Sequence, residues 1–287
     1  MRGATSAPTA RVLDVVELLA RPGNETLRFS DIVRELALTQ ATAHAILKTL
    51  TDRGWITRDP LTKTFALGPA LAVVAARTDA VRPLAHAAHA AAIEVGADLG
   101  YAASVVERVD DALIITAFEA GAAGSHTTRP GERIAYAPPF GVAFAAWDSP
   151  AGQRAWIERS GSTNPELVER LQRVLIRTRE RGFDVDWTTP ALGQMTQLVG
   201  ALRDDVPTHV RTMMEQLLVE FATIGLAPEE DSPRPQPIAS ISVPVFDHRD
   251  RVPLILSVHP FSAVPMQRVT AIGHRLIAAA DAIRPNG

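Results

Sequence analysis

Apolar residues recur at helical spacing in two stretches near the start of the chain. Residues 10–20, "ARVLDVVELLA", place apolar side chains three and four positions apart, which predicts an amphipathic helix. After the helix-breaking "RPGNE", the stretch "FSDIVRELAL" (29–38) has a second, shorter apolar face. Ser30 is its expected N-cap, because a serine hydroxyl can accept a hydrogen bond from a free amide of the first turn.

A third helix is predicted over "TQATAHAILKTLTDRG", with Thr39 as its cap and Gly54 just past its end. Its apolar positions share one side of the helix: Ala43, Ile46, Leu47 and Leu50. The two short runs Trp55–Arg58 and Thr64–Leu67 then read as strands joined by a turn. Three short helices followed by a hairpin are the layout of a winged helix-turn-helix, which we assign to residues 1–68.

The pattern continues into a linker helix and a second, larger domain. Pro69–Val81 predicts the linker helix, assigned to residues 69–82, and its proline suits a first helical position. Residues 83–287 form one domain whose apolar runs and turns predict two strand pairs, a further short strand and several helices. The strand pairs lie at 101–120 and 238–260, the single strand at 183–187, and the helices at 82–100, 138–147, 164–182, 189–226 and 264–283.

The expected fold is therefore α+β: an N-terminal winged helix-turn-helix, a linker helix, and a C-terminal antiparallel sheet with flanking helices. The two helical patterns within 189–226 are interpreted as a helical insertion in the second domain. A proline-rich polar loop follows them before the last strands.

Composition places this chain among globular proteins rather than membrane or secreted ones. Of 287 residues, 46 % are hydrophobic and 21 % charged, which is enough apolar material for a core. No apolar run reaches the roughly 18 to 20 residues that a membrane span needs, and the first residues lack the apolar segment of a secretory signal. The absence of cysteine excludes disulfides and fits a cytoplasmic location.

Charge is distributed unevenly along the chain. The net charge is −3, with +2 in residues 1–70 and −5 in the remainder. The sign of this asymmetry suits a DNA-binding N-terminal end, although the asymmetry is mild.

The stretches "LTQATAHAILKTLTDRGWI" and "FALGPAL" resemble the DNA-binding domain of the IclR family of bacterial transcription regulators. In the second domain, "RPGERIAYAPPFGVAFAAW", "RGFDVDW" and "IASISVPVFDHRDRVPLILSVHPFS" resemble later segments of the same family. The resemblance runs from Arg11 to Ile283. It implies a GAF-like C-terminal domain that binds a small-molecule effector, often an organic or aromatic acid.

Several residues depart from the pattern of the family. Ala45 stands where the family usually has an arginine on the reading helix, and Ala41 where it has a serine. Val142 replaces the usual lysine after the effector-loop glycine, and residues 189–228 enlarge a normally short link. These departures indicate a DNA sequence and a ligand that differ from those of well-studied members.

The outward side of the third helix is the candidate for reading base pairs, because such a helix fits the major groove of DNA. Gln40 suits adenine, Ala41 and Thr42 suit a thymine methyl, and His44 and Lys48 suit guanine or phosphate. Phosphate contacts, which set register and affinity, are expected from residues around it: Ser30, Thr39, Thr49, Arg53, Arg58 and Lys63. The competing interpretation is a solvated helix of a dimerisation or scaffold domain.

The second domain has no catalytic signature, so we expect no enzymatic activity, no cofactor and no metal. His86 and His89 lie three residues apart on one predicted helix. Because no acidic partner lies near them in the sequence, a core or dimer face is a better interpretation than a metal site.

By resemblance, the effector pocket is lined by five residues: Gly141, Val142, Ser240, Ser257 and His259. Free amides at a helix start suit a carboxylate, and Ser257 and His259 share one face of a strand. The competing interpretation is that these are satisfied sheet residues around a closed core, which leaves the second domain as a dimerisation or protein-partner module. The partners that we expect are a double-stranded DNA operator, an organic-acid effector and further copies of this chain, as a homodimer or tetramer that acts as a repressor or an activator.

Overall fold

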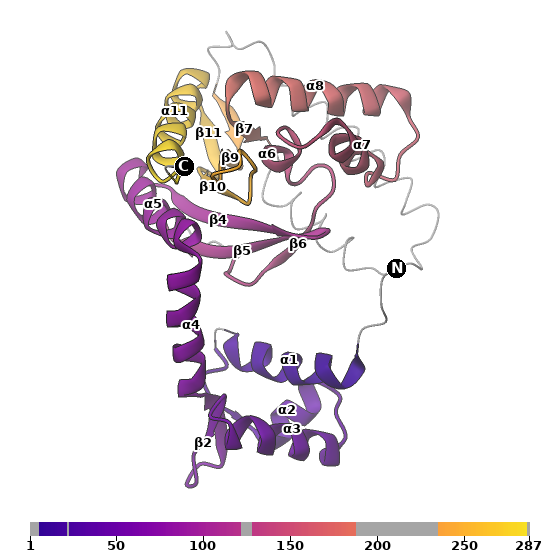
Figure 1. Ribbon diagram of the computed structural model, residues 1–287, viewed down its shortest axis with the longest axis vertical. Coiled ribbons are helices and arrows are strands. Elements are labelled where there is room, and N and C mark those ends of the chain that lie inside the picture. Colours follow the sequence, from indigo (N-terminus) through magenta and orange to yellow (C-terminus); the bar gives the residue numbers. More distant parts are fainter. Residues whose placement is uncertain (1–5, 22, 122–127, 188–234, 286–287) are drawn as a thin grey trace. The chain divides into compact units, whose positions relative to one another are not determined.

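The structure is a computed structural model that describes residues 6–21, 23–121, 128–187 and 235–285 (Figure 1). The chain divides into two compact units, Met1–Pro83 and Leu84–Gly287. The helical insertion predicted at 189–226 lies outside the described residues. Within the described ranges, no helix is long and apolar enough to cross a membrane.

The N-terminal unit consists of three helices and a small sheet. Helices α1 (Ala7–Ala20), α2 (Phe29–Glu35) and α3 (Gln40–Asp52) turn their apolar sides into one core. The side chains of this core are Val15, Leu18, Leu19, Ile32, Ile46, Leu47, Leu50, Ile56 and Phe65. Both helices flanking the turn at residues 36–39 therefore rest on the same core, and this fixes the outward side of α3.

Strands β2 (Ile56–Arg58) and β3 (Thr64–Leu67) form the predicted hairpin. A third strand, β1 (Leu27–Arg28), pairs with β3 on its other side, so the sheet order is β1-β3-β2. The sequence did not predict β1, because two residues are too few to show an alternating pattern.

The caps of α2 and α3 differ in how well the sequence predicted them. Thr39 is the N-cap of α3 as expected, and its hydroxyl accepts a hydrogen bond of 3.2 Å from the amide of Thr42. The prediction that Ser30 caps α2 is wrong. Strand β1 runs directly into the helix, so Arg28 is the extended cap residue, and its amide donates to the Asp31 carboxylate at 3.2 Å.

Helix α4 (Pro69–Val81) has the bounds predicted for the linker helix. No described side chain of α4 is buried. Its exposed apolar residues include Val73, which is 72 % exposed.

The C-terminal unit is built on a six-stranded antiparallel sheet with strand order β6-β5-β4-β10-β9-β7. Its strands are β4 (Ala102–Val109), β5 (Ala112–Glu119), β6 (Arg133–Ala135), β7 (Asp184–Asp186), β9 (Ser240–Val245) and β10 (Leu254–His259). Strands β8 (Gln236–Ile238) and β11 (Ser262–Val264) form a separate pair. The two predicted strand pairs are confirmed, whereas β6, β8 and β11 were not predicted.

Helices cover both faces of this sheet. On one face, α5 (Pro83–Leu99) and α11 (Met266–Ala282) close a core with alternate residues of β4, β9 and β10. On the other face lie α6 (Val142–Ala145), α7 (Pro150–Glu158) and α8 (Pro165–Arg181), packed on Val106 and Ile255 (Figure 1). The sequence did not predict α7. The GAF-like α+β expectation is otherwise confirmed.

Candidate DNA-reading surface and effector site

The outward side of α3 carries the predicted reading residues. Gln40, Ala41, His44, Lys48 and Thr49 are exposed, and Thr42 is half-buried. The four residues predicted to face inward are all buried, at positions 43, 46, 47 and 50. The helix thus separates a packed side from a side that is small and polar.

Several polar groups on this side are already engaged within the chain. The Lys48 ammonium lies 2.7 Å from the Asp52 carboxylate, and the Thr49 hydroxyl donates to the carbonyl of Ala45 at 2.9 Å. The hydroxyls of Thr39 and Thr42 are 2.8 Å apart. Among the described residues, the side chains of Gln40 and His44 have no hydrogen-bond partner, which leaves them available to a base edge.

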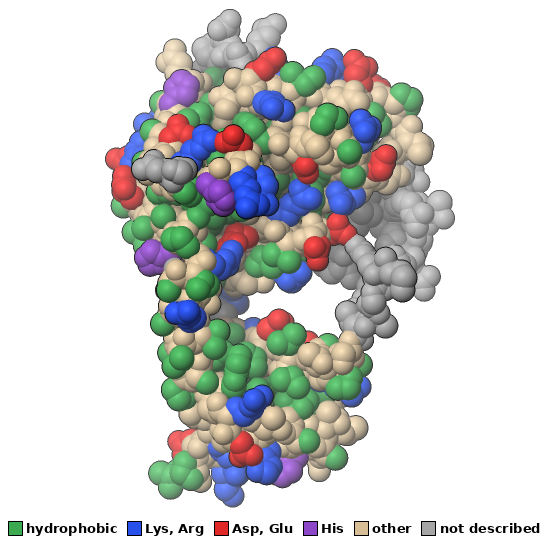
Figure 2. All heavy atoms as spheres, viewed as in Figure 1, with side chains coloured by type: hydrophobic (Ala, Val, Ile, Leu, Met, Phe, Trp, Pro, Cys, Tyr) green, Lys and Arg blue, Asp and Glu red, His purple; other side chains and the backbone are tan. Residues whose placement is uncertain are grey.

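Cationic residues surround the reading side. Arg53 at the end of α3 is exposed, as are Arg58 on β2 and Lys63 in the hairpin turn. In Figure 2, blue Lys and Arg side chains and a purple His gather at the lower end of the N-terminal unit, which carries α3 and the hairpin. Ser30 is exposed within the first turn of α2. These positions suit contacts to phosphates.

The candidate effector residues lie on the sheet face that α6 and α8 cover. Cross-strand partners point to the same face of a sheet, and the register pairs Asp184 with Ser242, Ser242 with Ser257, and Ser257 with Ser104. Ser240 pairs with Asp186 one step along the same face. The result is a polar row that crosses four strands of the sheet.

Hydrogen bonds connect members of this polar row. The hydroxyls of Ser242 and Ser257 are 2.8 Å apart, and both residues are buried. The Ser104 hydroxyl lies 2.8 Å from Nε2 of His259. The ring centroids of Phe118 and Phe261 lie 5.7 and 5.5 Å from that of His259. An aromatic group therefore adjoins the hydroxyls at one end of the row.

A carboxyl group stands at the other end of the polar row. Burial raises the pKa of Asp184 to about 7, the positive charge of Arg181 opposes this shift, and the negative charge of Asp186 adds to it. The hydroxyl of Thr178, on α8, donates to Asp184 at 3.5 Å. Near neutral pH this carboxyl can thus hold a proton and act as a hydrogen-bond donor.

Gly141 and Val142 approach the same face from α6, which packs on β9 and β10. Gly141 has a φ of +82°, and a Cβ there would lie 2.6 Å from the ring of Tyr136. Val142 is buried in the core with Ile255. The glycine thus allows the chain to turn tightly over Tyr136 before α6 begins.

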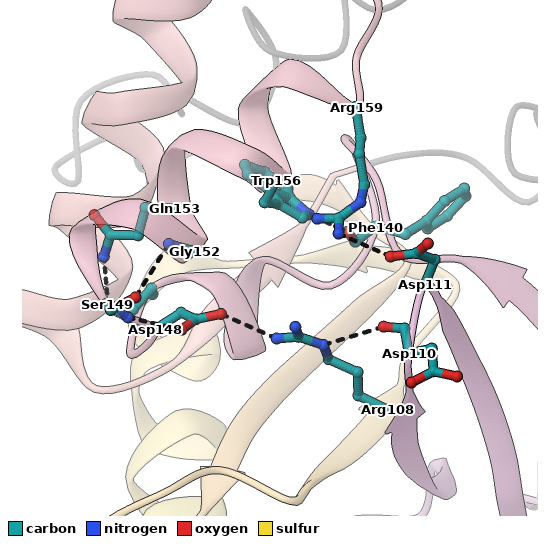
Figure 3. Close-up of polar contacts among 11 residues, drawn as sticks. Arg108, Asp110, Asp111, Phe140, Asp148, Ser149, Gly152, Gln153, Trp156 and Arg159 are labelled. Atoms are coloured by element: carbon teal, nitrogen blue, oxygen red, sulfur yellow. Dashed lines mark hydrogen bonds and ion pairs between the residues drawn. The ribbon is translucent and has the colours of Figure 1, made fainter. Parts of the chain in front are cut away.

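Two arginines fix the segment that contains Gly141. Arg108 pairs with Asp148 at 3.0 Å, and Arg159 pairs with Asp111 at 2.8 Å (Figure 3). The guanidinium carbons of Arg108 and Arg159 lie 4.1 and 5.3 Å from the ring centroid of Tyr136. Burial raises the pKa of Tyr136 to about 12, so its hydroxyl stays protonated.

A backbone contact completes this anchor. The indole of Trp156, on α7, donates to the carbonyl of Phe140 at 2.9 Å (Figure 3). The segment 136–148 is therefore held at Tyr136 by the two guanidinium groups, at Phe140 by the hydrogen bond from Trp156, and at Asp148 by the ion pair with Arg108. It is a preorganised support for the sheet face rather than a loose loop.

The structure adds four residues to the five predicted around this site: Ser104, Asp184, Asp186 and Ser242. Three of its strands contain a polar–apolar–polar triplet, "DVD" (184–186), "SIS" (240–242) and "SVH" (257–259). The repeated triplet was the signal in the sequence, since alternate residues of a strand share a face.

His86 and His89, predicted on one helix, both lie on α5. His89 on α5 lies 2.8 Å from Glu119, and both side chains are substantially exposed. Across residues 6–21, 23–121, 128–187 and 235–285, no group of three or more His, Cys, Asp or Glu side chains is arranged to hold a metal ion.

Comparison with known families identifies the N-terminal unit. Residues 8–60 match the IclR helix-turn-helix domain. This range contains α1 from its second residue, together with β1, α2, α3 and β2, and hence the whole outward side of α3. No curated protein matches the chain.

Solved structures match the fold along nearly the whole length. An IclR transcriptional regulator from Alicyclobacillus acidocaldarius is 21 % identical, covers 98 % of each chain and has a TM-score of 0.64. An IclR homologue from Microbacterium hydrocarbonoxydans, solved with 4-hydroxybenzoate, is 18 % identical over 96 % of this chain and 97 % of its own, with a TM-score of 0.63. HmgR from Pseudomonas aeruginosa is 20 % identical over 97 % of each chain, with a TM-score of 0.61.

Proposed function

We propose that this chain is an IclR-family transcriptional regulator with a DNA-binding helix-turn-helix, because residues 8–60 match that domain and the fold matches a solved IclR regulator. The residues that contact DNA and the ligand of the second domain are proposed from this premise. The matched family and fold are those of transcriptional regulators, not enzymes. The observation that carries the proposal is the small, polar outward side of α3 within the matched domain. We expect the protein to act in the cytoplasm, because its proposed target is DNA.

We propose that α3 enters the major groove of a double-stranded operator. Gln40 and His44 contact base edges, Ala41 and Thr42 contact thymine methyls, and Lys48 contacts guanine or phosphate. The cationic rim and the polar residues near it contact phosphates: Ser30, Thr39, Thr49, Arg53, Arg58 and Lys63.

A titration of DNA upstream of the gene at several salt concentrations tests this assignment. The logarithm of the binding constant falls linearly with the logarithm of the salt concentration, and each lost phosphate contact should reduce the steepness of this fall by about 0.9. Arg58→Ala or Lys63→Ala should therefore weaken binding to every duplex and flatten the salt dependence. A wild-type protein whose binding to these duplexes is insensitive to salt would contradict the proposal.

The second domain, we propose, binds a small organic or aromatic acid on the polar row. Support comes from the connected hydroxyls of Ser242 and Ser257, the aromatic group around His259, and Asp184 as a potential donor to a carboxylate. The IclR homologue from Microbacterium hydrocarbonoxydans, which has a similar fold, was solved with 4-hydroxybenzoate, a molecule with both an aromatic ring and a carboxylate. Gly141, Val142 and Ser240 border this row and complete the proposed site.

A thermal-shift screen with 4-hydroxybenzoate and other carboxylates tests the effector site. A binding acid should raise the melting temperature in wild type and less in Ser240→Ala, because Ser240 faces the site on β9. Ser262→Ala is the matched control, since Ser262 is exposed on β11 outside this row.

The alternative is a closed second domain that serves only as a dimerisation or protein-partner module. The burial of Val142, Ser242 and Ser257 favours this alternative. A screen in which no carboxylate shifts the melting temperature would support it.

We further propose that the regulator acts as a homodimer, or as a tetramer built from dimers. Paired half-sites raise the affinity of such modules for DNA. The exposed alanines and valines of α4 support pairing of this helix with a copy of itself.

A further inference from the structure

The tip of the β2–β3 hairpin presents a leucine to solvent. Leu61 is 90 % exposed, more than any other large hydrophobic residue in the described part of the chain. Pro60 precedes it, and Thr62 and Lys63 complete the turn. A single exposed leucine needs no explanation by itself, so the case depends on how this turn is built.

The carboxylate of Asp59 holds the turn in one shape. It accepts hydrogen bonds from the amides of Leu61 at 2.7 Å and Thr62 at 3.2 Å. The amide of Lys63 donates to the carbonyl of Asp59 at 2.9 Å, and Lys63 has a φ of +57°. The leucine thus projects from a preorganised backbone, and fixing it against a partner costs little conformational entropy.

Charge around the tip suits a polyanion. Arg58 and Lys63 are exposed on the two sides of the turn, and the guanidinium of Arg58 lies 5.8 Å from the ring centroid of Phe65. Hydrogen bonds from the amides of Leu61 and Thr62 keep the pKa of Asp59 below its ordinary value, so Asp59 stays negatively charged and the two cations leave the tip with a net positive charge. Figure 1 shows the hairpin projecting from the same end of the unit that carries α3.

We propose that Leu61 enters the minor groove of the operator beside the major-groove segment contacted by α3, and that it selects A·T over G·C pairs there. This inference rests on the proposed DNA binding. Arg58 and Lys63 contact the phosphates on either side of the groove, and Leu61 packs against its floor.

The selectivity follows from the chemistry of the minor groove. An A·T pair presents only acceptors there, whereas a G·C pair adds the exocyclic N2 amino group of guanine as a donor. A leucine side chain pressed against that amino group removes its water and offers no acceptor. An unpaired buried donor is costly, so G·C is disfavoured.

Inosine separates this readout from contacts in the major groove. An I·C pair has the major-groove face of G·C but lacks the N2 amino group, so its minor-groove face resembles that of A·T. A tight-binding duplex is first selected from a randomised pool, and footprinting locates the minor-groove positions that the protein protects. A·T, G·C and I·C are then placed at each protected position and the dissociation constants are measured.

Wild type should bind the A·T and I·C duplexes with similar affinity and the G·C duplex about tenfold more weakly. Leu61→Ser should reduce this discrimination to less than about twofold. The variant keeps the turn, because Asp59 bonds the backbone amide of residue 61. Leu13→Ser, at a leucine 56 % exposed on α1, is the matched control and should discriminate like wild type.

Three results would overturn the inference: equal binding of all three duplexes by wild type, full discrimination by Leu61→Ser, or a loss of self-association in that variant. The last result would assign Leu61 to contact with another copy of the chain. These results are distinct from failure of the proposed function, in which no salt-sensitive duplex is selected at all.

Discussion

At the scale of single residues, several polar side chains on the outward side of α3 already have partners within the chain in the absence of DNA. The ion pair between Lys48 and Asp52 joins two side chains that are 67 % and 59 % exposed. Such a pair contributes only a few tenths of a kcal/mol to stability. Its greater effect is on DNA binding, because Asp52 places a negative charge beside a lysine that is proposed to meet guanine or phosphate.

Asp52→Asn should therefore raise DNA affinity. It should also make the fall of log K with log salt concentration steeper by about 0.9, the amount expected for one additional phosphate contact. Lys48→Ala should have the opposite effect on affinity. Fluorescence anisotropy at several salt concentrations measures both. Asp14→Asn removes an equal charge from the exposed side of α1 and serves as the control, and an unchanged slope in Asp52→Asn would contradict the expectation.

The free energy of unfolding depends on pH through the carboxyl group of Asp184. Its folded pKa of about 7 exceeds its ordinary value of 3.8, so the folded state binds more protons between these two values. The contribution of this group to stability is therefore fully present below pH 3.8 and is lost as the pH rises to about 7.

Asp184→Asn should remove this part of the pH dependence. Urea unfolding from pH 4 to pH 7.5 should show the variant gaining stability relative to wild type as the pH rises, whereas a constant difference would count against a proton on Asp184. Asp281→Asn, at an exposed carboxylate of α11, provides the comparison for loss of one acid.

At the scale of elements, segments with a local sequence signal were predictable, and segments without one were not. The bounds of α4 and β3 match their predictions, because a proline marks the start of α4 and a turn precedes β3, and the bounds of α8 and α11 agree to within a few residues. Helix α7 was missed because only Trp156 and Ile157 of its nine residues are buried, which leaves no full apolar face.

The candidate sites followed the same rule. The packed side of α3 could be predicted because local spacing defines it. The polar row across β4, β10, β9 and β7 could not be predicted in full, because it depends on which strands become neighbours and in which register. Ser104 and His259 illustrate this, since their contact joins residues 155 positions apart.

Gly141 precedes α6 and has a left-handed backbone conformation, which glycine adopts more easily than other residues. Gly141→Ala should lower the free energy of unfolding by about 3 kcal/mol, because the left-handed backbone strain adds to a clash with Tyr136. Gly131→Ala is the control, since Gly131 has a φ of +87° but nothing within 4 Å of the added Cβ, and should cost about 1 kcal/mol. Urea unfolding of both variants measures the difference, and equal losses would exclude a role for Tyr136.

At the scale of the whole molecule, the regulator combines a reading unit of net positive charge with a remainder of net negative charge. This distribution directs the DNA-binding end toward the polyanion while leaving the total at −3. The fold that the resemblance to the IclR family implies is confirmed at this scale, since a solved IclR regulator shares it over 98 % of this chain.

The proposed dimer predicts that a charge on α4 separates the copies. Val73→Asp should move the molar mass measured by light scattering toward that of one chain, because it introduces a like-charge contact where two α4 helices would meet. Ile176→Asp, at a residue 56 % exposed on α8, should leave the mass unchanged. A wild type that is monomeric at micromolar concentration would contradict the dimer.

The pairing of β4 with β10 also has a consequence for biosynthesis. Every strand pair of the N-terminal unit closes within residues 27–67, so that unit can fold soon after it leaves the ribosome. The central strand β4, by contrast, waits for residues 254–259 before it gains its second neighbour. We therefore expect each nascent chain to be competent for DNA before it is competent for a ligand, so that a stalled or truncated product would occupy operators without responding to any signal.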